Sequence, residues 1–323
     1  MNRYANIFQK DATKYYGAPF DDAGAGITLR SSDLVNFRVY KVILAKASPV
    51  FKDMFSQGPA MREADEKETG TGHDQSTVFP VPEDSHTLAA LLTLCYPLDP
   101  PILSTLEEMA SVIAAAKKYG MDPAYKLATR TFAESQLLRE RPRMAYGIMC
   151  RYRLEHEARV AARACLQKPL ELDALDEELP FIDGRALREL WRYHRQCTAA
   201  VVALTQPENF GWITRRPGEL WEFPQDVCRC GRLKYTIGEN QARWCWWPKH
   251  WWNEYMQRAN VALKDVPCGD TVTARDILRP SFQDSEVCDK CKGNLVDCML
   301  EFSQYFADTI EAEISKIAIE LPF

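Results

Sequence analysis

The sequence has no long apolar run. A membrane-spanning helix needs about 20 mainly apolar residues, whereas the stretch LAALLTLCYPL is only 11 residues long. The first residues, MNRYANIFQK, also lack the apolar segment of a secretory signal. We therefore expect a soluble intracellular protein, in the cytoplasm, the nucleus or both, with no membrane partner.

An excess of positive charge is also missing. The net charge is −5 and the isoelectric point is near 5.7, which gives no general attraction to phosphate backbones. Seven arginines between Arg139 and Arg163 are the one basic concentration. Interspersed glutamates and helical spacing favour a solvated face over a nucleic-acid patch. The sequence thus predicts no nucleic-acid partner.

Motifs typical of enzymes are absent as well. There is no G-x-S-x-G turn and no G-x-x-x-x-G-K-[ST] phosphate loop. The GTG at 70–72 has no strand before it, and HEARV at 156–160 lacks the second histidine of a zinc protease. A cysteine–histidine nucleophile pair remains an alternative, because sequence alone cannot pair such residues. We expect no enzymatic activity.

Cysteine and tryptophan, by contrast, are abundant toward the C-terminus. Seven of the 11 cysteines and seven of the eight tryptophans follow residue 200. An odd cysteine count without a secretory signal argues against a disulfide framework. This shift in composition indicates a second module, as the length of 323 residues also does.

The clearest structural pattern runs from Arg30 to Phe55. Alternating apolar residues around a polar break predict a β-hairpin with its turn at Asp33–Asn36. The period then lengthens to about 3.6 residues, and Ser48 followed by Pro49 predicts a helix start. A hairpin therefore leads into two short helices that share one core. The expected core residues are Phe37, Val39, Leu44, Val50, Phe51, Met54 and Phe55.

This stretch, FRVYKVILAKASPVFKDMF, resembles the signature of BTB/POZ domains, where strand residues, a His-Lys pair and L…SPVF…MF follow in that order. It is most similar to the short BTB proteins that are abundant in fungi. The resemblance implies an α+β fold, a small sheet with flanking helices, over residues 20–140. Arg38 and Lys41 are on the exposed side of the alternation and adjoin the domain's polar pocket. The signature residues are Phe37, Arg38, Val39, Tyr40, Lys41, Leu44, Ser48, Pro49, Val50, Phe51, Met54 and Phe55.

Two positions depart from the family pattern. The aspartate that usually opens the first strand is Gly26 here, with Asp21 and Asp22 just upstream. The histidine that usually precedes Lys41 is Tyr40. Both positions belong to the polar pocket, so the resemblance does not carry over functions that use this pocket.

The rest of the domain follows from local patterns. Residues 56–76 lack apolar periodicity and are expected to form a loop, and TVFPVPE predicts a strand whose prolines favour a sheet edge. Asp84 or Ser85 then begins a helix. Asp122 is expected to cap a later helix, and Leu127 is expected to face inward on it. The domain should close near Leu138.

The residues after the Asp84 helix bear on ubiquitin ligases. BTB domains that recruit cullin-3 often carry Tyr-Thr-Gly and a further strand at this point. This chain has Tyr96-Pro97-Leu98 followed by two more prolines. Cullin recruitment is therefore kept as the second interpretation.

The predicted organisation has four segments: an N-terminal tail at 1–19, the BTB/POZ domain at 20–140, a helical extension at 141–205, and a mainly helical Trp/Cys-rich region at 206–323. The tail is expected either to form one helix or to be frayed. Beyond the domain, helical spacing predicts helices between Pro142 and Leu166, after Asp183, after Pro248 and after Asn294.

One cysteine pattern is typical of zinc sites. Zinc takes four tetrahedral ligands, commonly as two close pairs, and Cys288 and Cys291 have C-x₂-C spacing. Cys228 and Cys230 are closer together than usual, and Cys245, His250 and Cys268 are substitutes for them. Reduced thiols packed among tryptophans are the preferred interpretation, so no cofactor is expected unless a structural zinc is bound.

Function is therefore expected to be protein binding. The BTB/POZ resemblance implies surfaces for self-association, as a homodimer, and for protein partners, without chemistry. One alternative is a substrate adaptor of a cullin-3-type ubiquitin ligase with the Trp/Cys-rich region as substrate receptor. The other is a zinc-supported transcription or chromatin scaffold.

Overall fold

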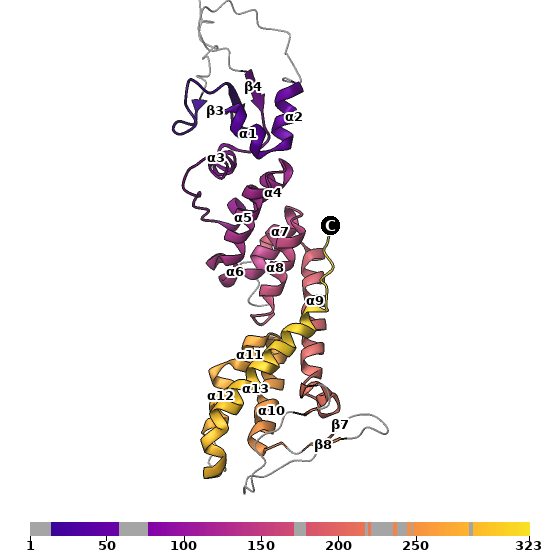
Figure 1. Ribbon diagram of the computed structural model, residues 1–323. Coiled ribbons are helices and arrows are strands. Elements are labelled where there is room, and N and C mark those ends of the chain that lie inside the picture. The colour runs from indigo at the N-terminus through magenta and orange to yellow at the C-terminus, as the bar shows by residue number, and fades with distance from the viewer. Residues whose placement is uncertain are drawn as a thin grey trace, which may run out of the picture. The chain divides into compact units, whose positions relative to one another are not determined.

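The chain divides into two compact units, Met1–Leu138 and Arg139–Phe323 (Figure 1). The helical extension and the Trp/Cys-rich region, predicted as separate segments, both lie in the second unit. The computed structural model describes residues 14–57, 77–170, 179–216, 219–220, 235–237, 244–246, 248–283 and 287–323.

A four-stranded mixed sheet lies at the centre of the first unit. Its order is β1 (Lys14–Tyr15), β3 (Val35–Val39), β2 (Ile27–Arg30) and β4 (Thr77–Pro80). Strands β2 and β3 are the predicted antiparallel hairpin, whereas β1 runs parallel to β3 and β4 runs parallel to β2. The predicted edge position of β4 is confirmed by this strand order. A proline is tolerated there, because an edge strand has a neighbour on one side only.

Six helices accompany the sheet among the residues described up to position 140. Helices α1 and α2 follow the hairpin directly, as predicted, and the others follow β4. The predicted α+β class is therefore confirmed for this unit. The bounds are α1 (Lys41–Ala47), α2 (Pro49–Gln57), α3 (Ser85–Thr93), α4 (Leu106–Lys118), α5 (Asp122–Glu134) and α6 (Gln136–Glu140).

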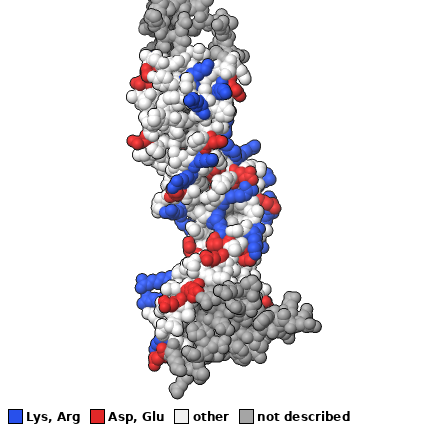
Figure 2. Space-filling model, viewed as in Figure 1, with Lys and Arg blue, Asp and Glu red and all other residues white. Residues whose placement is uncertain are grey.

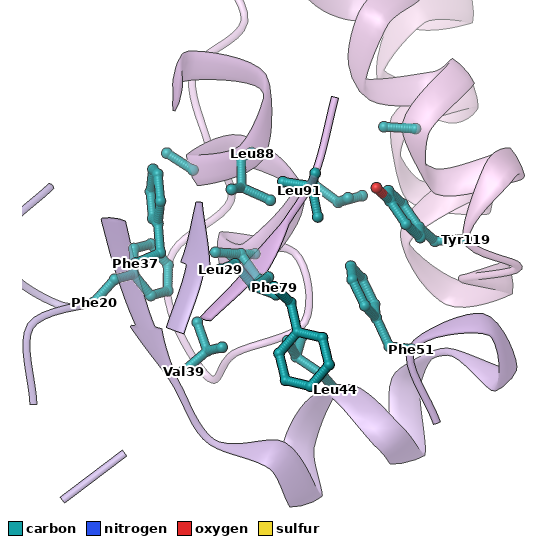
Figure 3. Close-up of a cluster of buried hydrophobic side chains, with 14 of the residues drawn as sticks. Phe20, Leu29, Phe37, Val39, Leu44, Phe51, Phe79, Leu88, Leu91 and Tyr119 are labelled. Carbon is teal, nitrogen blue, oxygen red and sulfur yellow. The ribbon is translucent and has the colours of Figure 1, made fainter. Parts of the chain in front are cut away.

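The core lies between the sheet and the helices (Figure 3). Phe37 and Val39 of β3, Leu44 of α1, and Phe51 and Phe55 of α2 are all buried. The alternation of β3 sends every second side chain to this face. Met54, also expected in the core, is only partly buried and packs against it.

Ser48 joins the hairpin and its helices to α4. Its hydroxyl accepts a hydrogen bond from the Phe51 amide at 3.0 Å, which caps α2 as predicted. The same hydroxyl donates to the Tyr119 carbonyl at the end of α4, at 2.5 Å. Beside it the Phe51 and Tyr119 rings stack with centroids 4.3 Å apart, and Figure 3 shows these two side chains facing each other.

The predicted burial of two residues is wrong. Val50 is 42% exposed, because it lies about 100° around α2 from Phe51, at the edge of the buried face. Leu127 of α5 is also exposed, since the buried face of that helix follows Ala124, Ala128 and Phe132. Asp122 is the first residue of α5, and its expected place as the cap is taken by Met121.

The hairpin turn also differs from the prediction. It spans Ser31–Leu34 and ends before Asn36, which lies within β3 opposite Arg30. The Arg30 side chain donates to the Asn36 side chain at 2.9 Å. The Ser31 hydroxyl accepts from the Val35 amide at 3.0 Å and donates to its carbonyl. A buried, paired asparagine therefore belongs to the ladder, although its residue type favours turns.

The N-terminal tail reaches into the sheet. Lys14–Tyr15 forms strand β1, paired with Val35 and Asn36 of β3, so the segment expected to be a tail at 1–19 contributes an edge strand. The helix expected in this segment falls largely on residues 1–13, which lie outside the described residues.

The second unit is mainly helical, as predicted. Two short antiparallel strand pairs, β5 with β6 and β7 with β8, interrupt its helices. The elements are α7 (Pro142–Arg151), α8 (Glu155–Cys165), η2 (Leu179–Phe181), α9 (Gly184–Ala203), η3 (Pro207–Trp212), β5 (Thr214–Arg216), β6 (Glu219–Leu220), β7 (Tyr235–Ile237), β8 (Trp244–Trp246), α10 (His250–Asp265), α11 (Gly269–Thr273), α12 (Arg275–Phe282) and α13 (Asp289–Ser315).

Aromatic rings fill the core of this unit. Trp252 of α10 lies edge-on to Phe302 of α13, with centroids 5.6 Å apart, and Trp212 stacks on Phe306 at 4.9 Å. Asp183 caps α9 as predicted, by accepting from the Arg185 and Ala186 amides. Helix α13 begins at Asp289, five residues before the predicted start at Asn294, because the extended Cys288 acts as its N-cap.

Several arginines of the second unit pair with acidic side chains. Figure 2 shows Lys and Arg interspersed with Asp and Glu on the visible face. Arg159 pairs with Glu155 at 2.6 Å, and Arg163 pairs with Glu311. Arg143 differs, since it is buried and donates to the Pro169 carbonyl at 3.0 Å. In the described part of the chain, no helix is both long and apolar enough to cross a membrane.

Leu34 is strained, and we predict that Leu34→Asn stabilises the first unit. Leu34 has φ of +62° and is 66% exposed. A left-handed conformation costs a leucine about 1–2 kcal/mol, whereas asparagine adopts it more readily. We expect a gain of about 1 kcal/mol, measured as a roughly fivefold slower hydrogen exchange of the β2 and β3 amides.

Leu98→Asn is the matched control, because Leu98 is exposed and is not among the residues of positive φ. Its amide exchange should equal that of the wild type. If the β2 and β3 amides of Leu34→Asn exchange as fast as in the wild type, or faster, the backbone at Leu34 is not strained.

Candidate protein-interaction surface

Strand β3 places two polar side chains beside the core. Phe37 and Val39 point into the core, so Arg38 between them faces the opposite side of the sheet and is half-buried. The strand ends at Val39, and the extended Tyr40 leads into α1. The Tyr40 amide donates to the Tyr96 hydroxyl at 2.9 Å, which fixes the start of α1 to the segment after α3.

Tyr40 also binds the loop before β2. Its hydroxyl donates a hydrogen bond to the Asp22 carboxylate, whose other oxygen accepts from the Gly24 amide at 2.8 Å. These two hydrogen bonds, with the nearby positive charge of Arg38, lower the pKa of Asp22. The same hydrogen bond from Tyr40 to Asp22 raises the pKa of Tyr40. Near neutral pH the pair is therefore a tyrosine hydroxyl and a carboxylate.

The residues around β1 extend this surface. The Arg38 guanidinium lies over the Tyr15 ring, 4.7 Å from its centroid, a cation–π arrangement. The Tyr16 ring stacks on buried Phe37 at 4.6 Å. The Arg38 amide donates to the Phe20 carbonyl at 2.8 Å, which holds the preceding loop against β3.

These contacts link Tyr15, Tyr16, Asp22, Arg38 and Tyr40. We group them with Val42, which follows Tyr40 by two positions, as the tyrosine strip. Tyr15, Tyr16 and Tyr40 are exposed, and Val42 in the first turn of α1 is 68% exposed. The contacts link three segments that are distant in sequence: β1, the loop before β2, and the junction of β3 with α1. The strip is therefore rich in exposed aromatic side chains, which are held by a hydrogen bond to Tyr40, ring stacking of Tyr16 and the cation–π contact of Tyr15.

Unlike Tyr40, which binds the loop before β2, Lys41 reaches α2 with its side chain. Its ammonium donates to the Phe55 carbonyl near the end of α2, at 3.4 Å, where the helix dipole favours a cation. Of the two residues expected to adjoin the polar pocket, Arg38 thus lies in the tyrosine strip, whereas Lys41 links α1 to α2.

Sequence reasoning missed part of this surface. Tyr15 and Tyr16 were expected in a tail or a helix, and their place beside β3 depends on a parallel pairing of two residues. Tyr96 interacts across 56 positions. The available signal was Asp21-Asp22 upstream of the first strand, together with tyrosine at position 40.

The four cysteines of the candidate zinc site are only partly within the described residues. Cys288 is the N-cap of α13, and the Cys291 amide donates to its carbonyl at 2.9 Å. Both side chains are half-buried. Cys228 and Cys230 lie outside the described residues. Within the described ranges, no group of three or more His, Cys, Asp or Glu side chains is placed to hold a metal.

A comparison with models of protein families matches residues 25–136 to the BTB/POZ domain. These residues form a BTB/POZ domain. A search of curated proteins finds no relative that matches the chain. BTB/POZ domains mediate binding of protein partners and are generally not enzymes, so the first unit contains a protein-interaction module. In this BTB/POZ domain, Tyr40 occupies the position of the usual histidine and pairs with Asp22.

We predict that Tyr40→Phe raises the pKa of Asp22 toward its ordinary value of 3.8, because the variant removes the hydrogen bond that contributes most to the lowering. In the wild type, a lowered folded-state pKa means that Asp22 favours the folded state above about pH 4, and this contribution is lost as the pH falls. The measurement is the carboxyl ¹³C titration of Asp22.

Asp33 serves as the internal control. Hydrogen bonds from Ser31 and Ser85 lower its pKa to about 2, and none of them involves Tyr40. Its titration should be the same in both proteins. An Asp22 midpoint that does not move would show that Tyr40 does not stabilise the carboxylate.

Proposed function

We propose that this chain is a non-enzymatic interaction protein that self-associates through its BTB/POZ domain, with the tyrosine strip as part of the contact. The observation that carries the proposal is the group of exposed Tyr15, Tyr16, Tyr40 and Val42 side chains. Tyrosine and arginine are enriched at protein interfaces and among the residues that dominate binding energy.

The strip is also ordered before any partner binds. Tyr16 is held by stacking on Phe37, and Tyr40 is held by Asp22 through its hydroxyl and by Tyr96 through its amide. Immobilising a flexible side chain on binding costs about 0.5–1.5 kcal/mol. Side chains that are already fixed avoid part of this cost, which favours association through this surface.

Partner binding to a cullin is the second candidate. Residues 94–105 connect α3 to α4, and the structure shows turns and irregular backbone there without a strand. The further strand that often accompanies cullin-3 recruitment is thus absent from this fully described connection. In the adaptor role, the second unit would be the substrate receptor. The missing strand counts against that role, so we place self-association first.

We predict that the 323-residue chain is a dimer at about 10 μM by native mass spectrometry, and that Val42→Asp weakens the dimer at least tenfold. A carboxylate at an apolar contact would be desolvated without a partner, and tenfold corresponds to about 1.4 kcal/mol. Leu127→Asp is the control, because Leu127 is exposed on α5, a helix that supplies none of the residues of the strip.

Adding an N-terminal fragment of cullin-3 to the same sample separates the two candidates. The proposal expects the dimer to persist without a cullin complex at tens of micromolar. If the chain is a monomer and forms a complex with the cullin fragment, the adaptor role would replace self-association. A dimer equally weakened by both variants would exclude the strip as the contact.

We also propose that Cys288 and Cys291 bind a structural zinc. Zinc commonly takes cysteine ligands from close pairs, and Cys288 and Cys291 have the C-x₂-C spacing of such a pair. Both cysteines lie at the start of α13, which supplies Phe302 and Phe306 to the core of the second unit. A metal there would fix the start of this helix. Cys228 and Cys230 are the proposed remaining ligands.

We predict about one zinc per chain in native mass spectra of protein purified without chelator, and no zinc in the double variant Cys288→Ser, Cys291→Ser. Cys95→Ser is the control, since Cys95 lies after α3 in the first unit and donates to the Leu91 carbonyl. A metal-free wild type after zinc addition, or zinc retained in the double variant, would contradict the site.

A further inference from the structure

A cavity of about 470 Å³ lies along α9 in the second unit, beside the end of α10. Small-molecule sites in proteins commonly have volumes of about 300–1,000 Å³ and mainly apolar walls with a few polar groups. Among the described residues, none of the BTB/POZ domain lines this cavity, and neither does Cys288 or Cys291.

One face of α9 supplies most of the lining. Trp191, Arg195, Thr198 and Val202 follow each other by four, three and four positions, so they lie on the same side of the helix. Trp191 and Val202 are half-buried, whereas Arg195 is exposed. The cavity therefore has apolar walls and a charged rim.

The rim is net positive. Lys264 and Asp265, from the last turn of α10, also line the cavity and are exposed. With Arg195, the rim carries two cations and one carboxylate. This balance favours a ligand with one negative charge.

His194 places a buried ring nitrogen beside the cavity. It lines the cavity and is only 7% exposed. Its Nδ1 lies 3.4 Å from the Thr198 hydroxyl, and its Nε2 has no hydrogen-bond partner among the described residues. Burial lowers the pKa of His194, and Asp265 opposes this effect. A buried nitrogen of this kind costs stability unless a water or ligand binds it.

We propose that this cavity binds a small amphipathic carboxylate. Its apolar body would lie against Trp191 and Val202, and its carboxylate would lie at the rim with Arg195 and Lys264. A polar atom of the ligand would satisfy His194. The site is independent of self-association through the BTB/POZ domain.

The test uses 1-naphthoate as probe, with 1-naphthamide as the uncharged molecule of equal size, on the whole 323-residue chain. We expect 1-naphthoate to bind by calorimetry with a Kd on the order of 1 mM or tighter. The amide should bind about fivefold more weakly, the effect of one charge pair at about 4 Å in water. The ¹⁵N signal of His194 should shift on binding, and the chain has only five histidines.

Arg195→Gln tests the rim, and Arg185→Gln is its control on the same helix. Both arginines are exposed, and only Arg195 lines the cavity. We expect about fivefold weaker binding of 1-naphthoate to Arg195→Gln and no change in Arg185→Gln. No saturable binding at about 10 mM, equal affinity for the amide, or an unmoved His194 signal would overturn the proposal, as would equal effects of the two variants.

Discussion

The Ser48 hydroxyl is the contact on which the BTB/POZ domain depends most. It accepts from the Phe51 amide and donates to the Tyr119 carbonyl, so one buried atom caps α2 and also satisfies the end of α4. The adjacent Gly120 has φ of +63°, and a side-chain carbon there would lie 3.2 Å from the Pro49 ring. The hairpin, its helices and the later helices thus meet where a serine, a proline and a glycine are all needed.

Much of this fold could be predicted because its determinants are local. The alternation of β3, the Ser48-Pro49 helix start and the Asp84 cap each depend on residues a few positions apart. The failures were of two kinds. Val50 and Leu127 are apolar residues at the edge of a buried face, where residue type does not decide exposure. Asn36 was assigned to the turn from its composition, although its pairing with Arg30 places it in a strand.

The tyrosine strip could not be predicted as a surface, because its contacts are not local. Tyr40 interacts with Asp22 across 18 positions and with Tyr96 across 56. Tyr15 reaches Arg38 only because two residues of β1 pair with β3. The cavity in the second unit shows the same limit. The spacing of Trp191, Arg195, Thr198 and Val202 is visible in the sequence, but the arrival of Lys264 beside them depends on how α9 and α10 pack.

Tyrosine at position 40 has a consequence for how this surface responds to its surroundings. A histidine there would change its charge near pH 6.5, within the range that cells use for signalling. Tyr40 has a raised pKa and Asp22 a lowered one, so neither group titrates between pH 5 and 8. The pair of Tyr40 and Asp22 therefore keeps one charge state between pH 5 and 8, and a proton cannot act as its switch in that range.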